Sequence, residues 1–124
     1  MAHVTGIGGV FFRARDPQKL QQWYVDHLGI EPDADGYVVM RWGGAHEGST
    51  VWAPFPEDTE YFGSPEAGYM INYRVDDLNA MLDKLIVAGV KVDDLQHEDE
   101  NGRFGWAWDP EGNRIELWEP AAGF

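Results

Sequence analysis

Residues 102 to 120 are the most structurally informative part of the chain, and they read Gly102-Arg-Phe-Gly-Trp-Ala-Trp-Asp-Pro-Glu-Gly-Asn-Arg-Ile-Glu-Leu-Trp-Glu-Pro120. Two short runs rich in aromatic and aliphatic residues flank the segment Asp109-Pro-Glu-Gly-Asn113. In that segment Pro110 presets its φ angle and Gly112 accepts a left-handed conformation, as tight turns require. The pattern predicts a β-hairpin with strands over residues 104–108 and 114–118.

Upstream of this hairpin the sequence predicts a strand, a helix and a further strand. Residues 70–75 read as a strand, and Asp76-Asp77 provides an N-cap for the helix that follows. Gly89 ends this helix, and the next strand opens at residues 90–92. The apolar side of the helix is formed by Leu78, Met81, Leu82, Leu85 and Ile86.

The first half of the chain repeats this order. A strand is predicted over 8–15, Asp16-Pro17 starts a helix, Gly29 ends it, and strands follow over 37–42 and 50–55 with a glycine-rich hairpin loop between them. Asp16 and Asp77 lie 61 residues apart and Gly29 and Gly89 lie 60 apart. We therefore predict an α+β domain of two βαβββ modules, approximately residues 5–56 and 68–120, with residues 54–68 as the linker.

Composition limits the classes of partner. The 124 residues suit one domain, and the absence of cysteine excludes disulfides and thiolate sites. No signal peptide or membrane-spanning run is apparent, so we expect a cytoplasmic protein. The net charge of −13, from 22 acidic and 9 basic residues, disfavours nucleic acids and anionic lipid. This charge either serves solubility alone or concentrates a cationic ligand near the site.

At this point the chain resembles the glyoxalase/bleomycin-resistance/dioxygenase (vicinal oxygen chelate, VOC) superfamily. The resemblance rests on Phe12-Arg-Ala-Arg-Asp-Pro17, on Trp23-Tyr24, on Leu28-Gly29-Ile30 and on the closing hairpin. It covers nearly the whole chain and is weakest between Glu31 and Gly68. It implies that the two βαβββ modules form a curled mixed sheet around a cavity, usually in a homodimer.

The resemblance also indicates where the ligands of a catalytic metal would lie, because metal-using members place His or Glu on four strands that face the cavity. Those positions fall on Gly9, near Trp52, on Met70 and on Glu116, so only Glu116 matches. One carboxylate does not hold a catalytic ion, which needs several converging ligands. We therefore expect no metal and no other cofactor, unless a loop histidine, His46 or His97, completes the site.

Strand alternation predicts which side chains line the cavity, because residues two apart share a face. The polar groups of this face include Glu116, which is the candidate base, and the remaining side chains are candidates for ligand binding. These are Phe11, Arg13, Trp52, Met70, Asn72, Arg74, Arg114 and Trp118. Aromatic walls with few polar groups are typical of a small-molecule site. Alternatively, the arginines and Glu116 neutralise one another as structural pairs.

Three functions are compatible with this pocket. The first is metal-free capture of a flat or cationic small molecule, as bleomycin-type members of the superfamily do, by stacking on tryptophan. The second is an enzyme, either a lyase/isomerase or dioxygenase that uses a metal, or a metal-free version with Glu116 as base and Arg13 or Arg74 stabilising an anion. The third is an interaction module without a ligand, whose sheet only dimerises.

Overall fold

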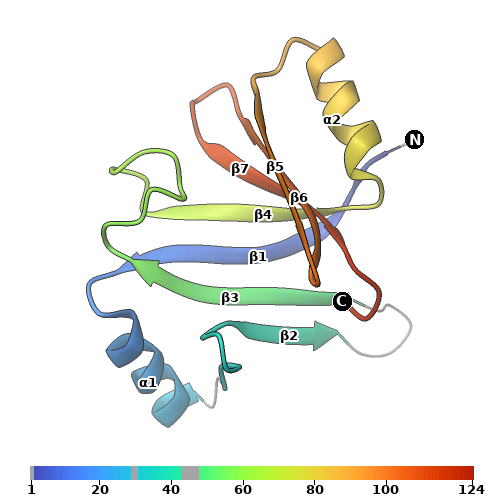
Figure 1. The fold of residues 1–124 in the computed structure, drawn as a ribbon. Helices are drawn as coiled ribbons and strands as arrows, with labels where there is room; N and C mark the ends of the chain where they lie inside the picture. Colours follow the sequence, from blue (N-terminus) through green and yellow to red (C-terminus); the bar gives the residue numbers. More distant parts are fainter. Residues whose placement is uncertain (1, 29–30, 43–47) are drawn as a thin grey trace.

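The computed structural model describes residues 2–28, 31–42 and 48–124, with the side chains of residues 23, 24, 27 and 28 excepted (Figure 1). The elements, in chain order, are β1 (Val4–Ala14), α1 (Pro17–Leu28), β2 (Val38–Trp42), β3 (Gly48–Pro56), β4 (Tyr69–Val75), α2 (Leu78–Val87), β5 (Val92–Asp99), β6 (Gly102–Trp108) and β7 (Arg114–Pro120). The second half has the full βαβββ order. In the first half, the described residues contain two strands after the helix.

All seven described strands belong to one mixed sheet in the order β2-β3-β1-β4-β7-β6-β5. The antiparallel pair of β1 and β4 lies at the centre, and each of these strands has a parallel neighbour, β3 or β7, from its own half of the chain. Figure 1 shows α1 and α2 at opposite corners of the curled sheet. These observations confirm the predicted α+β fold, while the exact module boundaries stay a prediction.

Local sequence signals account for both helix starts. The Asp16 carboxylate accepts a hydrogen bond from the backbone N–H of Lys19 at 3.1 Å, and the Asp77 carboxylate accepts one from Ala80 at 3.0 Å. Each contact satisfies an N–H that the first helical turn leaves without a partner. Gly89, the predicted stop of α2, has a left-handed backbone with a φ of +82°. Gly29, the predicted stop of α1, lies outside the described residues.

The closing hairpin forms as the sequence predicts. Asp109 accepts hydrogen bonds from the backbone N–H groups of Glu111 and Asn113, both at 2.9 Å, and Gly112 has a φ of +82°. This turn fixes the register in which Trp106 of β6 lies opposite Glu116 of β7. The register decides the site, because it places these two side chains on the same face of the sheet.

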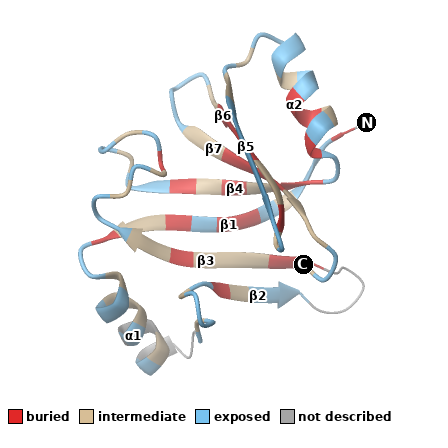
Figure 2. Ribbon diagram, viewed as in Figure 1, coloured by how far each residue is buried: buried red, intermediate tan, exposed pale blue. Residues whose placement is uncertain are grey.

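The sheet has a buried cluster on each face, and Figure 2 shows buried positions alternating with less buried ones along its central strands. One cluster packs α2 against the sheet and contains Ala2, Val75, Leu78, Met81, Leu82 and Leu117. The other lies on the opposite, concave face and contains Phe11, Ala53, Phe62, Met70 and Trp106. No helix in the described residues is long and apolar enough to cross a membrane.

Replacing Leu78 by alanine tests the packing of α2 on the sheet. The Leu78 side chain is fully buried, so we expect Leu78→Ala to lower the free energy of unfolding by about 3 kcal/mol through the cavity it leaves. Val87 on the same helix is 88% exposed, and Val87→Ala should change stability by less than about 0.5 kcal/mol. Urea denaturation measures both variants, and equal effects would contradict this packing.

Candidate functional site

The concave face of the sheet holds a pocket of about 710 Å³, lined by residues of the strands, of the linker between β3 and β4, and of the loops before β2 and between β5 and β6. Of the described residues, seven aromatic side chains line it: Phe11, Tyr37, Phe55, Tyr61, Phe104, Trp106 and Trp118. Four exposed carboxylates also line it: Asp33, Asp35, Asp99 and Glu100. The pocket therefore combines aromatic walls with an acidic rim.

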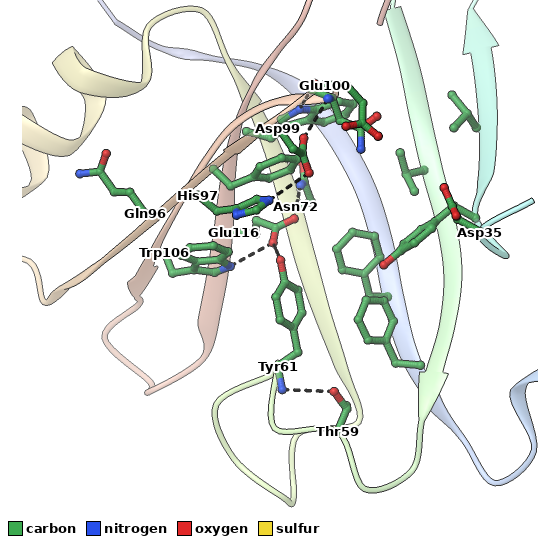
Figure 3. A pocket seen from close by; sticks show the side chains of 18 of the residues that line it. Asp35, Thr59, Tyr61, Asn72, Gln96, His97, Asp99, Glu100, Trp106 and Glu116 are labelled. Atoms are coloured by element: carbon green, nitrogen blue, oxygen red, sulfur yellow. Dashed lines mark hydrogen bonds and ion pairs between the residues drawn. The ribbon is translucent and has the colours of Figure 1, made fainter. Parts of the chain in front are cut away.

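Glu116 lies at the floor of this pocket and is 1% exposed. Its neighbours in the sheet are Asn72 on β4 and Trp106 on β6, so both flanking strands direct a polar group toward it. Asn72 Nδ2 donates to Glu116 Oε1 at 2.6 Å, and Trp106 Nε1 donates to Oε2 at 3.0 Å. The Tyr61 hydroxyl, from the linker, also donates to Oε2, and Figure 3 shows these groups converging.

Burial sets the electrostatics of this floor. It raises the pKa of Glu116 above its usual range, while the hydrogen bonds from Tyr61, Asn72 and Trp106 act in the opposite direction. Burial and the nearby Glu116 charge also raise the pKa of the Tyr61 hydroxyl, which therefore keeps its proton and donates a hydrogen bond to the carboxylate. Glu116 can hold a proton inside an apolar pocket, as a general base or a hydrogen-bonding anchor would require.

A glycine makes room for this arrangement. A Cβ atom at Gly8 would lie 1.9 Å from Asn72 Oδ1 and 2.8 Å from the Trp118 ring. Any side chain at residue 8 would therefore displace one of two groups that line the pocket. Asn72 Oδ1 is itself buried without a hydrogen-bond partner. The Asn72 side chain is fixed by its amide nitrogen, which donates a hydrogen bond to Glu116.

Arg13 does not reach the pocket but holds the linker. Its guanidinium donates to the backbone oxygens of four linker residues at 2.5 to 3.0 Å, namely Glu57, Thr59, Ser64 and Ala67. It also lies over the ring of Phe62, which is 1% exposed. Thr59 and Tyr61, which line the pocket, lie within the segment that these contacts fix. Arg13 therefore shapes the site indirectly.

Arg114 and Arg74 likewise have structural partners. Arg114 forms an ion pair with Asp93 at 2.8 Å and donates to the backbone oxygen of Tyr61 at 3.2 Å. Arg74 donates to Ser49 and to the backbone oxygen of Phe124. None of the three predicted arginines pairs with Glu116, so they neither form the expected structural pairs with it nor point into the pocket.

The remaining predicted side chains divide between the two faces of the sheet. Phe11, Asn72, Glu116 and Trp118 line the pocket, and Met70 is buried in the cluster beneath it. Trp52 differs from the prediction, because it packs against Phe12 on the opposite face, with ring centroids 5.3 Å apart. In β3 the lining residues are Val51 and Phe55, so the register expected from sequence was shifted by one residue.

The described His, Asp and Glu side chains are not arranged to bind a catalytic metal. They contain no group of three His, Asp or Glu side chains able to hold an ion. Both Glu116 oxygens already accept hydrogen bonds, and the His97 ring is 3.0 Å from Asp99 in an exposed pair. His46 lies outside the described residues.

Sequence reasoning missed several groups of the site. Trp106 is not among the predicted site residues, although the hairpin turn at 109–113 places it opposite Glu116 and could have identified it. Tyr61 comes from the linker, where no strand periodicity indicates the direction of a side chain. The rim carboxylates were seen only as net charge, because Asp35 and Asp99 are far apart in the sequence.

Comparison with known proteins places the chain in a family. Residues 9–118 match the model of the glyoxalase-like domain, so the protein belongs to the glyoxalase-like domain family, within the superfamily expected from its sequence. No protein of curated function matches the chain.

Solved structures show the same fold. The crystal structure of methylmalonyl-CoA epimerase from Mycobacterium tuberculosis is 27% identical, with a TM-score of 0.60 over 95% of this chain and 89% of that one. A variant of Streptomyces coelicolor methylmalonyl-CoA epimerase in complex with 2-nitronate-propionyl-CoA is 18% identical, with a TM-score of 0.72 over 97% and 100%. NAD-dependent benzaldehyde dehydrogenase from Legionella pneumophila is 14% identical, with a TM-score of 0.58 over 91% and 98%.

The raised pKa of Glu116 predicts that the free energy of unfolding depends on pH. A carboxyl whose pKa is raised by folding binds protons more tightly in the native state, so its contribution to stability falls as pH rises above the ordinary value of 4.5. We expect the stability of Glu116→Gln relative to the original chain to increase with pH above that value, by at most about 1.4 kcal/mol per pH unit. Urea denaturation from pH 4 to 8 measures this difference, and parallel curves would contradict it.

Proposed function

We propose that this protein binds a flat, cationic small molecule in the aromatic pocket and needs no metal to do so. The observation that carries the proposal is the coexistence of seven aromatic side chains and four rim carboxylates around one cavity. Aromatic faces attract cations through their quadrupoles, and the carboxylates add a long-range attraction of the same sign. Capture of such a molecule, or its sequestration, is the function that this combination favours.

The size and interior of the pocket suit a ligand of several rings. A cavity of about 710 Å³ lies within the range of typical small-molecule sites. Phe55 and Tyr61 lie parallel with centroids 5.4 Å apart, and Tyr61 meets Trp106 edge-on at 6.0 Å. A planar guest can extend such a stack. The open cavity also argues against a module that uses its sheet only to dimerise.

The charge of the lining argues for a cation. No lysine or arginine is among the described residues that line the pocket, and residues 1, 29–30 and 43–47 include none in the sequence. His97 supplies the basic group of the described lining, and it is paired with Asp99. With a net charge of −13 for the whole chain, the local field and the overall field act together.

The same charge argues against transferring the ligand of the structural neighbours. Several methylmalonyl-CoA epimerase structures among them are described in complex with CoA derivatives, whose phosphate groups carry negative charge. In this chain a CoA phosphate at the pocket mouth would meet Asp33, Asp35, Asp99 and Glu100. The negative phosphate and the negative carboxylates would repel each other, so a CoA thioester is a poor ligand for this pocket.

An enzymatic function is the alternative, as a lyase/isomerase or dioxygenase of the superfamily. Its metal-free form has a candidate base in Glu116, whose pKa is raised. It lacks the anion-stabilising groups expected from sequence, because the guanidinium groups of Arg13 and Arg74 bind backbone oxygens and neither arginine lines the pocket. We therefore place binding first. The homodimer implied by the family resemblance stays a prediction.

Three probes with the same two-ring skeleton test the proposal: N-methylquinolinium, quinoline at pH 8, and 2-naphthoate. We expect the cation to quench tryptophan fluorescence and to bind at least about tenfold more tightly than the neutral ring, with the anion weakest. The advantage of the cation should decrease in the double variant Asp33→Asn, Asp99→Asn and at high salt.

The variant Glu111→Gln serves as the matched control, because it removes one negative charge from an exposed turn that does not line the pocket. Its preference for the cation should be unchanged. Equal affinity for all three probes in the original chain would show that the rim charge does not select the ligand, and the proposal would be wrong.

Metal independence has its own test. The purified protein, dialysed against Mn, Fe, Co, Ni and Zn salts and freed of excess, should retain well under one ion per chain. Because Glu116 is the matching ligand position, one bound ion per chain that is lost in Glu116→Ala would overturn the metal-free proposal and favour the enzyme.

A further inference from the structure

Two arginines that do not line the pocket converge on residues 123 and 124. Arg74, on β4, is 9% exposed and donates to the backbone oxygen of Phe124 at 2.8 Å. Arg41, on β2, donates to the backbone oxygen of Gly123. Residues 121–124 follow β7 in sequence, and Figure 1 shows the end of the chain lying beside β3.

Arg74 has the features of a receptor for an anion. Its remaining contacts are with the backbone oxygen and the hydroxyl of Ser49, at 3.2 and 3.4 Å, and no carboxylate side chain of the described residues forms an ion pair with it. Arg103 and Arg114, by contrast, pair with acidic side chains. Burial accordingly lowers the pKa of Arg74. A buried cation is normally compensated by an opposite charge, and no acidic side chain of the described residues supplies one here.

The surroundings of Arg74 suit an aromatic ring attached to the anion. The guanidinium lies over the indoles of Trp42 and Trp118, at 5.3 and 5.2 Å from their centroids. The ring of Phe124 meets Trp118 edge-on at 6.0 Å and lies below the Arg41 guanidinium at 5.1 Å. The backbone oxygen and the ring of Phe124 thus occupy adjoining parts of this site. Ser49 Oγ is 3.4 Å from the same oxygen.

We propose that Arg74, Arg41 and Ser49, with Trp42 and Trp118, form a site for a small aromatic carboxylate, which Phe124 occupies in this structure. An ionised oxygen in this position forms charge-assisted hydrogen bonds with Arg74, which are stronger than those of a neutral acceptor. The ring and the oxygen can come from the chain itself or from a free acid of similar shape. Trp118 lies between this site and the cation pocket, but Arg74 and Ser49 do not line that pocket, so the inference does not rest on the proposed function.

Phenylacetate and 2-phenylethanol form a matched pair of probes, since they share the ring and differ in the charged group. We expect the full-length variant Phe124→Ala to bind phenylacetate at least about tenfold more tightly than 2-phenylethanol, because the competing ring is gone. The original chain should bind phenylacetate severalfold more weakly than Phe124→Ala does. Isothermal titration calorimetry measures these affinities.

The location of binding is read from indole N–H signals by NMR. Phenylacetate should shift the signal of Trp42, which does not line the other pocket, and leave that of Trp106, which does, unchanged; Trp118 borders both sites and does not distinguish them. Combining Phe124→Ala with Arg74→Met should remove the preference for the carboxylate. If that variant does not fold, Arg41→Gln, at an exposed residue, should weaken binding severalfold, whereas the exposed control Arg15→Gln should not.

Two results would overturn the proposal. Equal affinity of Phe124→Ala for phenylacetate and 2-phenylethanol would show that Arg74 does not act as an anion receptor. Equal affinity of the original chain and Phe124→Ala for phenylacetate would show that Phe124 does not compete for the site. Neither result bears on the cation pocket.

Discussion

The carboxylate of Glu116 is the constraint on which the rest of the concave face depends. A buried carboxylate is costly unless its oxygens are satisfied, and here the donors come from β4, β6 and the linker. Meeting that requirement ties together three elements that are distant in sequence. It also explains why β1 carries Gly8 beside Asn72, since a side chain there would displace the amide that holds Glu116.

The arginines of this acidic protein serve mainly to organise irregular backbone. Arg13 binds four carbonyl oxygens of the linker and Arg114 binds the backbone of Tyr61, so the segment that covers the pocket floor is fixed without any regular secondary structure. An isolated loop of this length would have a large conformational entropy. The guanidinium fork, with five donors in one plane, suits this task better than an ammonium does.

The sequence predicts the fold well because its signals are local. The caps Asp16 and Asp77 and the turn at 109–113 specify where elements begin and end, and they need no tertiary information. The site was predicted in part: strand alternation identified Phe11, Asn72, Glu116 and Trp118 as residues that now line the pocket. It misplaced Trp52, because one residue of register in β3 reverses every side chain. It could not place Tyr61, whose direction depends on contacts between Arg13 and the linker.

The central position of β1 has a consequence for biosynthesis. Among the described strands of this sheet β1 is synthesised before its partners, and β3 and β4 leave the ribosome about 40 to 60 residues later, as their registers with Gly9 show. Until then both edges of β1 are unpaired, a condition that promotes association between nascent chains. Gly6, Gly8 and Gly9 weaken the strand in isolation. Gly8, which makes space beside the pocket floor, thus also belongs to a run that disfavours premature pairing of the newly made strand.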